Sequence, residues 1–173
     1  KLKVVKLKTM AETLLFIQKH DFADFDALAD YADAASSRTK ELTAKIKAAE
    51  SRMAEIAVLK THIINYAKTR DIYTAYRKAG YSRKYYDAHE SDITIHKAAK
   101  KAFDDLALKK LPTVKSLQAE YSDLLVQKKL DYAELSKARD EAKRLQIHKA
   151  NAEMLLRTDA EEQRQTREHQ QEK

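Results

Sequence analysis

The sequence predicts an all-α protein, an elongated antiparallel coiled-coil-like hairpin of two long helices with shorter helices at the N-terminus and at the turn. The 173 residues include one glycine and one proline, whereas average usage would supply about a dozen and about nine. Sheets need these residues in their turns. Ala, Lys, Glu, Leu and Arg predominate instead, as in long helices. Because 35% of the residues are charged, the apolar seams must be narrow.

A first helix is expected at about residues 7–19, where apolar residues recur at helical spacing. These residues are Leu7, Met10, Leu14, Leu15 and Ile17. Residues 21–26 form a polar break that contains Phe22 and Phe25. We expect the two phenylalanines to anchor the first helix onto the next, and residues 1–25 to form the first segment.

The first long helix is predicted from about residue 26 to residue 79, a stretch without glycine or proline. Its heptad seam consists of Leu42, Ile46, Ala49, Met53 and Ile56, and continues through Ile63, Tyr66, Arg70 and Tyr73. The Ser36–Ser37 pair is where a kink would form. Gly80 supplies a left-handed residue that ends helices, and Arg77 and Lys78 complement the helix dipole.

A middle helix is expected at about residues 82–106, with Ser82 as its N-cap and with a potential break at residues 90–92. Residues 108–112 should form a loop, because the residue before Pro112 disfavours α geometry. The middle helix should pack at the closed end of the hairpin.

The second long helix is predicted to begin after Thr113, its N-cap. One seam series is Leu117, Leu124, Asp131, Ala138, Leu145 and Ala152, and its companion is Tyr121, Lys128, Leu135, Ala142, Lys149 and Leu156. Charged residues within this seam argue against a tightly specified dimer. The hairpin covers residues 26–158, and residues 159–173 form a polar tail, either a frayed helix end or a disordered linker.

Positive charge is concentrated in residues 60–115. The chain carries a net charge of +7, and this stretch alone contains 13 basic and 6 acidic residues. It also holds six of the nine tyrosines. Basic side chains neutralise phosphates and phenol rings offer stacking surfaces, which suggests a DNA-contacting surface. Its candidate residues are Lys68, Arg70, Tyr76, Arg77, Lys78, Tyr81, Arg83, Lys84, Tyr85, Lys100 and Lys101. Alternatively, the tyrosines fill the core of the turn while Lys and Arg extend outward.

No catalytic, metal or cofactor site is predicted. No two histidines lie three or four residues apart. His89 and His96, with Glu90 and Asp92, could line a weak metal site, but we interpret them as packed or exposed side chains. A single glycine excludes a Gly-rich phosphate loop. The sequence has no cysteine and no apolar run of about 18 residues, so disulfides and a membrane span are not expected.

Three segments carry a resemblance to a known family. They are His62–Tyr85, then Ile95–Asp105 joined to Leu111–Tyr121, and the opening Leu7–Phe16. Together they resemble the C-terminal helical region of relaxase/mobilisation nuclease proteins from mobile elements of Gram-positive gut bacteria. The resemblance spans nearly the whole chain, from about residue 7 to residue 156.

In that family, an N-terminal nuclease domain nicks the transfer origin through a tyrosine, assisted by a histidine-bound metal. None of those motifs occurs here, so the resemblance implies a non-catalytic accessory domain behind an upstream nuclease domain. The chain begins with Lys1, which also suggests a fragment of a longer protein. The expected partners are DNA, the upstream nuclease domain, transfer-machinery proteins and a second copy of the chain, in the bacterial cytoplasm.

Two other functions remain open. The chain could be a purely structural coiled-coil scaffold that mediates self-association through its seams. It could also be a residual enzyme that uses the tyrosine cluster, although Tyr85 or Tyr86 as a covalent nucleophile would need metal-binding histidines nearby. The seams could close within one chain or between two chains.

Overall fold

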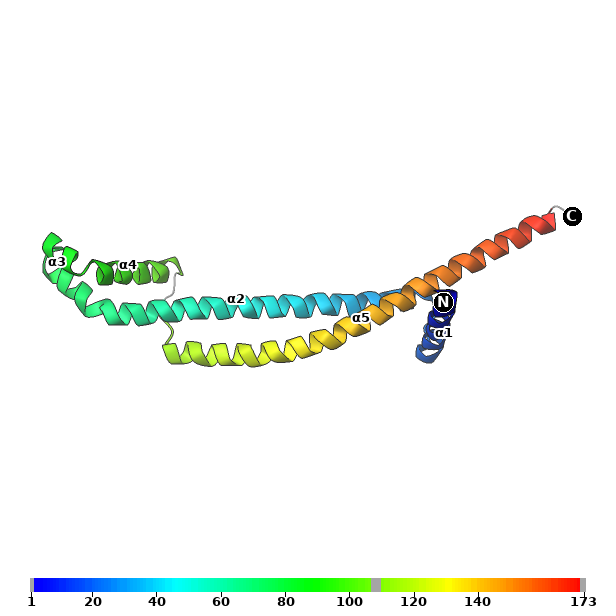
Figure 1. Cartoon of the computed structure of the whole chain (residues 1–173), viewed down its shortest axis with the longest axis horizontal. Coiled ribbons are helices and arrows are strands. Elements are labelled where there is room, and N and C mark those ends of the chain that lie inside the picture. Colours follow the sequence, from blue (N-terminus) through cyan, green and yellow to red (C-terminus); the bar gives the residue numbers. More distant parts are fainter. Residues whose placement is uncertain (1, 107–109, 172–173) are drawn as a thin grey trace. The chain divides into compact units, whose positions relative to one another are not determined.

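The computed structural model describes residues 2–106 and 110–171, with side chains described for residues 7–106 and 110–168. Its helices are α1 (Leu2–His20), α2 (Phe25–Lys78), α3 (Arg83–Ala88), α4 (Glu90–Asp105) and α5 (Val114–Gln171) (Figure 1). The described residues contain no strand, which confirms the all-α prediction. None of the helices within these ranges is long and apolar enough to cross a membrane.

The chain divides into two units, and both long helices contribute to each. We call residues 46–130 the central unit, and residues 1–45 with 131–173 the terminal unit. Ion pairs show that α2 and α5 run antiparallel within each unit. Arg52 pairs with Glu120 at 2.7 Å and Glu50 with Lys128 at 3.4 Å in the central unit. In the terminal unit, Arg38 pairs with Glu134, and Asp33 pairs with Lys149 at 2.9 Å.

The core of the central unit lies where α2, α4 and α5 meet. Its buried side chains are Ile56, Leu59, Ala99, Phe103 and Leu117, surrounded by the partly buried Ile63, Tyr66 and Leu124. The ring of Phe103 meets that of Tyr66 edge-on at 5.5 Å between centroids. The middle helix α4 therefore packs against both long helices, as predicted, and its position is set by a small aromatic and aliphatic core.

The terminal unit has a core of leucine and alanine side chains between α2 and α5, closed on one side by α1. Its buried residues include Leu28, Ala32, Leu42, Leu135, Ala138, Ala142, Leu145 and Ala152. Thr13 of α1 is also fully buried, and its hydroxyl donates to the carbonyl of Thr9 at 2.9 Å. Small residues at the contact let the helices approach closely, so the seam is narrow.

The predicted seams are largely confirmed. On α5, five of the six residues in the series that begins at Leu117 are buried, and Leu124 is half-buried. The companion series is buried only at Leu135 and Ala142. Lys128 and Lys149 are tolerated in the seam because their ammonium groups reach carboxylates on α2.

One of the two predicted N-caps, Thr113, is confirmed, and the other, Ser82, is not. The amide of Ser116 donates to the hydroxyl oxygen of Thr113 at 3.0 Å, which confirms the predicted cap of α5. The amide of Ala27 donates to a carboxylate oxygen of Asp24 at 2.8 Å and caps α2. Ser82 precedes α3 without a side-chain capping bond.

Several local expectations need correction. Helix α2 runs without interruption through Ser36 and Ser37, and the Ser36 hydroxyl donates to the carbonyl of Ala32 within the same helix. The break in the middle region falls at His89, one residue before the expected stretch. Helix α5 continues to Gln171, so the described part of the polar tail is helical. Residues 108 and 109 of the expected loop lie outside the described residues.

The first helix turns a different face to the protein than its leucines predicted. Leu7, Leu14 and Leu15 are 68%, 55% and 65% exposed. The inward face instead carries Thr13, together with half-buried residues that include Phe16. Phe22 does link α1 to α2, as expected: its ring lies 5.9 Å from that of Phe16 and 5.7 Å from that of Tyr31.

Helix α2 ends in a Schellman motif centred on Gly80. The amide of Gly80 donates to the carbonyl of Arg77 at 3.0 Å, and that of Tyr81 to the carbonyl of Tyr76 at 3.1 Å. Gly80 has φ +63°, and Tyr81 follows with φ +62°. The left-handed glycine predicted from the sequence is therefore present, and it fixes where the chain leaves α2.

Replacing Gly80 tests this motif. A Cβ at Gly80 would meet no atom within 4 Å, so the cost of Gly80→Ala is conformational, about 1 kcal/mol in the free energy of unfolding. Gly80→Asn should cost less, because asparagine tolerates left-handed geometry. Urea denaturation followed by circular dichroism measures both, and equal stability of Gly80→Ala and the unmodified chain would contradict the assignment.

Candidate nucleic-acid interface

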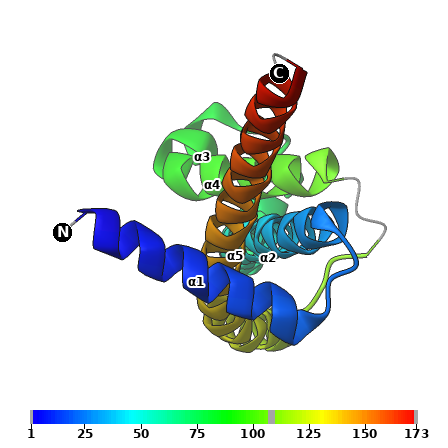
Figure 2. The same cartoon turned by 90° about the vertical axis from the view of Figure 1, so that its right-hand side faces the viewer.

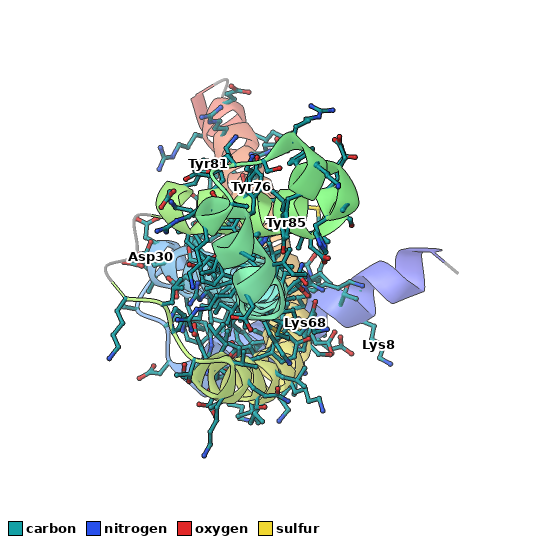
Figure 3. All side chains as sticks on the ribbon, turned by 90° about the vertical axis from the view of Figure 1, so that its left-hand side faces the viewer. Lys8, Asp30, Lys68, Tyr76, Tyr81 and Tyr85 are labelled. Atoms are coloured by element: carbon teal, nitrogen blue, oxygen red, sulfur yellow. The ribbon has the colours of Figure 1, made fainter. Side chains whose placement is uncertain are left out.

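The turn after α2 gathers a cluster of tyrosine rings around Tyr76. The Tyr76 ring is 8% exposed and lies 5.2 Å from Tyr81, 6.2 Å from Tyr73 and 6.0 Å from Tyr86, between centroids. Tyr85 is 6.3 Å away and nearly parallel to it. Figure 3 shows Tyr76, Tyr81 and Tyr85 grouped at this end of α2. The Schellman motif creates the cluster, because it folds Tyr81 back onto Tyr76.

The tyrosines differ in what they offer to a ligand. Tyr81 is 58% exposed, and Tyr85 is half-buried. Tyr76 lies inside the cluster, so it supports the other rings and cannot itself present a stacking face. The turn thus combines a filled interior, as the packing alternative predicted, with one ring that remains open to solvent.

Two cations lie over these rings. The Lys97 ammonium is 5.9 Å from the centroid of Tyr76 and 5.7 Å from that of Tyr86. The Arg83 guanidinium is 5.7 Å from Tyr86 and pairs with Asp87 at 2.9 Å. Cation–π attraction of this kind is worth about 0.5–1 kcal/mol at exposed sites. The contacts hold α3 and α4 against the end of α2.

Lys97 was not among the candidates from the sequence. It lies three and four residues before Lys100 and Lys101, so helical periodicity places it on the same side of α4. That spacing was a usable signal. Its contact with rings from α2 and α3 could not be read from the sequence, because it depends on how α4 folds back.

The remaining basic candidates are exposed but do not form one compact group. Arg77, Lys78 and Lys84 surround the turn, and none forms an ion pair within the described part of the chain. Lys68 and Arg70 lie further back along α2, roughly 12–15 Å from the end of the helix at 1.5 Å per residue. Lys100 and Lys101 lie one turn beyond Lys97 on α4. The residues closest to the exposed tyrosine are therefore Arg77, Lys78, Arg83 and Lys84.

His96 supports the cluster from inside. Its ring stacks between those of Tyr66 and Tyr73, at 4.4 and 4.3 Å, and its Nδ1 lies 3.0 Å from the Thr69 hydroxyl. That hydroxyl donates to the carbonyl of Asn65, so Nδ1–H of His96 is the donor in their contact. Burial, helped by the charge of Lys100, lowers the pKa of His96.

The histidines and carboxylates near the turn are not arranged as a metal site. Among the side chains that the structure describes, those of residues 7–106 and 110–168, no three from His, Asp or Glu are grouped so that they could hold an ion. His96 is buried against tyrosines, while Tyr85 contacts the half-buried His89 at 4.5 Å between centroids. The geometry at the turn suits contact with an extended anion, through exposed cations around one open aromatic ring.

Comparison with known proteins identifies no relative: no family model, no curated protein and no solved structure matches this chain.

The buried His96 and the half-buried His148 predict a loss of stability in mild acid. Burial lowers the folded-state pKa of both His96 and His148 below the usual 6.5. The unfolded chain therefore binds protons first as pH falls through about 6.5, and unfolding becomes easier. Urea midpoints should fall between pH 7.5 and 5.5, above the range in which carboxylates titrate.

His96→Phe and His148→Phe provide the comparison, because each keeps the ring and removes the titrating nitrogen. Each variant should show a smaller decrease over the same pH interval than the unmodified chain. A pH dependence that is unchanged in the double variant would rule out these histidines as its source.

Proposed function

We propose that the turn between α2 and α4 binds nucleic acid, and that the chain is a helical accessory region of a relaxase-type mobilisation protein. The observation that supports the proposal most directly is the coincidence of charge and rings. Residues 60–115 hold the whole net charge of the chain. The exposed cations Arg77, Lys78 and Lys84 flank an exposed tyrosine, Tyr81, at the turn that the Schellman motif forms.

The proposed binding is mainly electrostatic. Lysine and arginine side chains would neutralise phosphates and release counterions, which supplies affinity without reading sequence. The Tyr81 hydroxyl could donate to a phosphate oxygen, or its ring could lie against a base. Tyr76 and Lys97 would act indirectly, because they hold Tyr81, Tyr86 and α3 in position.

The biological setting rests on the resemblance of three segments to relaxase proteins. In such a protein, this region would follow the nuclease domain and hold DNA near the nick, or would contact transfer-machinery proteins. We assign no catalytic step to this chain, since cleavage would belong to the upstream domain.

A four-residue variant tests the interface. Binding to a fluorescent DNA should weaken by tenfold or more at low salt when four residues are changed together to Ala: Arg77, Lys78, Arg83 and Lys84. The slope of log affinity against log salt should also fall by about 0.9 for each phosphate that the variant no longer neutralises. Fluorescence anisotropy at several salt concentrations measures both quantities.

The matched control removes four charges outside residues 60–115. Lys45, Lys47, Arg139 and Lys143 are all exposed, and changing them to Ala leaves the same net charge as the test variant. The control should keep at least most of the affinity and the full salt slope. If both variants weaken binding equally, the effect is one of net charge and the proposed interface is wrong.

A second candidate function is self-association, and α1 provides an observation in its favour. Three leucines of this helix, Leu7, Leu14 and Leu15, are more than half exposed. Leu7 and Leu14 are separated by two helical turns and so share one face. An exposed apolar stripe of this kind is a typical contact between helices.

Self-association predicts a molar mass that rises with concentration in light scattering. Leu7, Leu14 and Leu15 changed together to Lys should then abolish the rise. Changing Ala160, Gln163 and Gln165 to Lys adds the same charge at exposed positions of α5 and should leave it intact. A molar mass that equals that of one chain at every concentration would exclude self-association and leave DNA binding as the proposed function.

A further inference from the structure

A second site lies in the terminal unit, where α1 rests against α5 (Figure 2). It is a pocket of about 360 Å³, within the range of small-molecule sites. Its walls include Phe16 and His20 of α1, Tyr31 of α2, and Lys137, Arg144 and His148 of α5. None of these residues belongs to the proposed nucleic-acid interface.

One wall of the pocket is aromatic. The rings of Phe16 and His148 are stacked at 4.3 Å with an interplanar angle of 10°, and His20 lies 4.3 Å from Phe16 on α1. Tyr31 lies 6.3 Å from His20 and is 43% exposed. Rings that border a pocket and remain partly uncovered can stack on a flat ligand.

The hydrogen bonds around Thr13 fix the protonation of His148. The buried Thr13 hydroxyl donates to the carbonyl of Thr9 at 2.9 Å and accepts from Asn151 Nδ2 at 3.0 Å. Its remaining lone pair faces His148 Nδ1 at 3.0 Å, so Nδ1 carries the hydrogen and donates it. In the neutral imidazole, Nε2 is then an acceptor.

The acceptor nitrogen opens to the pocket. Nε2 of His148 makes no hydrogen bond to the described residues. Every buried side-chain nitrogen or oxygen in these residues does have a hydrogen-bond partner. Nε2 must therefore be accessible to solvent, and the pocket that His148 lines provides the access. Burial lowers the pKa of His148 against the opposing charge of Glu12, while Arg144 and His20 act in the same direction as burial.

The α5 side of the pocket carries two cations, on the same helix face as His148. Lys137 and Arg144 are seven residues apart on α5, so both project from one face. Arg144 uses Nε for the carbonyl of Asp140 in its own helix, at 3.4 Å, and its terminal nitrogens make no bond to the described part of the chain. Glu141 lies between them and lowers the charge of this wall to +1. A small anion fits this balance better than a polyanion.

We propose that the pocket binds a nucleoside monophosphate, either free or as the terminal nucleotide of a strand. The base stacks against the aromatic wall beside Tyr31 and His20. An N–H of the base donates to Nε2 of His148, and the phosphate accepts from Lys137 and Arg144. Each of the three ligand parts thus meets a chemically matching group, and the inference does not depend on the proposed function of the turn.

Calorimetric titration of the full chain with adenosine 5′-monophosphate tests the site. The nucleotide should bind at least tenfold more tightly than adenosine or inorganic phosphate, because neither of these carries both a base and a phosphate. His148→Phe, which keeps the stack on Phe16 but removes Nε2, should weaken binding by up to roughly tenfold. Tyr31→Leu, at an exposed position, should weaken it by about fivefold or more.

The charged wall has its own variant and control. Lys137→Ala with Arg144→Ala should abolish the preference for the nucleotide over adenosine. Arg139→Ala with Lys143→Ala removes two exposed charges from the same helix and should leave that preference unchanged. Circular dichroism confirms that each variant folds. Equal nucleotide affinity in the Tyr31, His148 and Lys137/Arg144 variants, or no binding at millimolar nucleotide, would overturn the proposal.

A competition experiment distinguishes a free nucleotide from the terminal nucleotide of a strand. It uses the variant in which Arg77, Lys78, Arg83 and Lys84 are changed to Ala, so that DNA binding at the turn does not interfere. A short strand with a 5′-phosphate that displaces the mononucleotide, while the unphosphorylated strand does not, identifies a strand end as the ligand. If neither strand competes, the ligand is a free nucleotide. Binding of the mononucleotide to the pocket can therefore be measured in this background whether or not the turn binds DNA.

Discussion

The packing of Phe103 is the contact on which the central unit depends. Its ring closes the small core in which α4 meets α2 and α5, edge-on to Tyr66. Tyr66 in turn stacks on His96, and His96 on Tyr73, so one row of rings runs from the core toward the turn. Removing Phe103 would leave α4 held mainly by Ile93, His96 and Ala99. The position of Lys97 over Tyr76 and Tyr86 would then no longer be fixed.

The same combination of groups occurs once in each unit. In both, a buried threonine donates to the carbonyl four residues earlier in its helix and accepts from Nδ1 of a histidine in another helix. The histidine is also stacked on an aromatic ring. A polar pair of this kind costs little, since every buried donor has an acceptor. It also leaves Nε2 of each imidazole available, and in the terminal unit that atom faces a pocket.

Much of this fold could be predicted from residue spacing and capping signals. Patterns within a single helix were enough to predict the two long helices, the Thr113 cap, the end of α2 at Gly80 and most of the α5 seam. The inward face of α1 was not predicted, because the leucines of this helix form an apolar stripe on another face and the buried Thr13 is polar. The sequence predicted that tyrosines are concentrated near the turn. It did not predict that Tyr76 is buried and Tyr81 is exposed, because this difference depends on the backbone conformation at Gly80. The pocket of the terminal unit was not foreseen, since it joins residues of three helices that are up to 132 positions apart in sequence.

The boundary between the two units has a consequence for how such a sequence can change in length. It falls inside α2 and inside α5, where the chain has no loop to absorb an extra residue. One inserted residue would rotate everything beyond it by about 100° around the helix axis. The apolar seam would then turn away from its partner helix over the rest of the element. Related sequences should therefore gain or lose residues within these two helices in blocks of about seven, and in matching blocks on both helices.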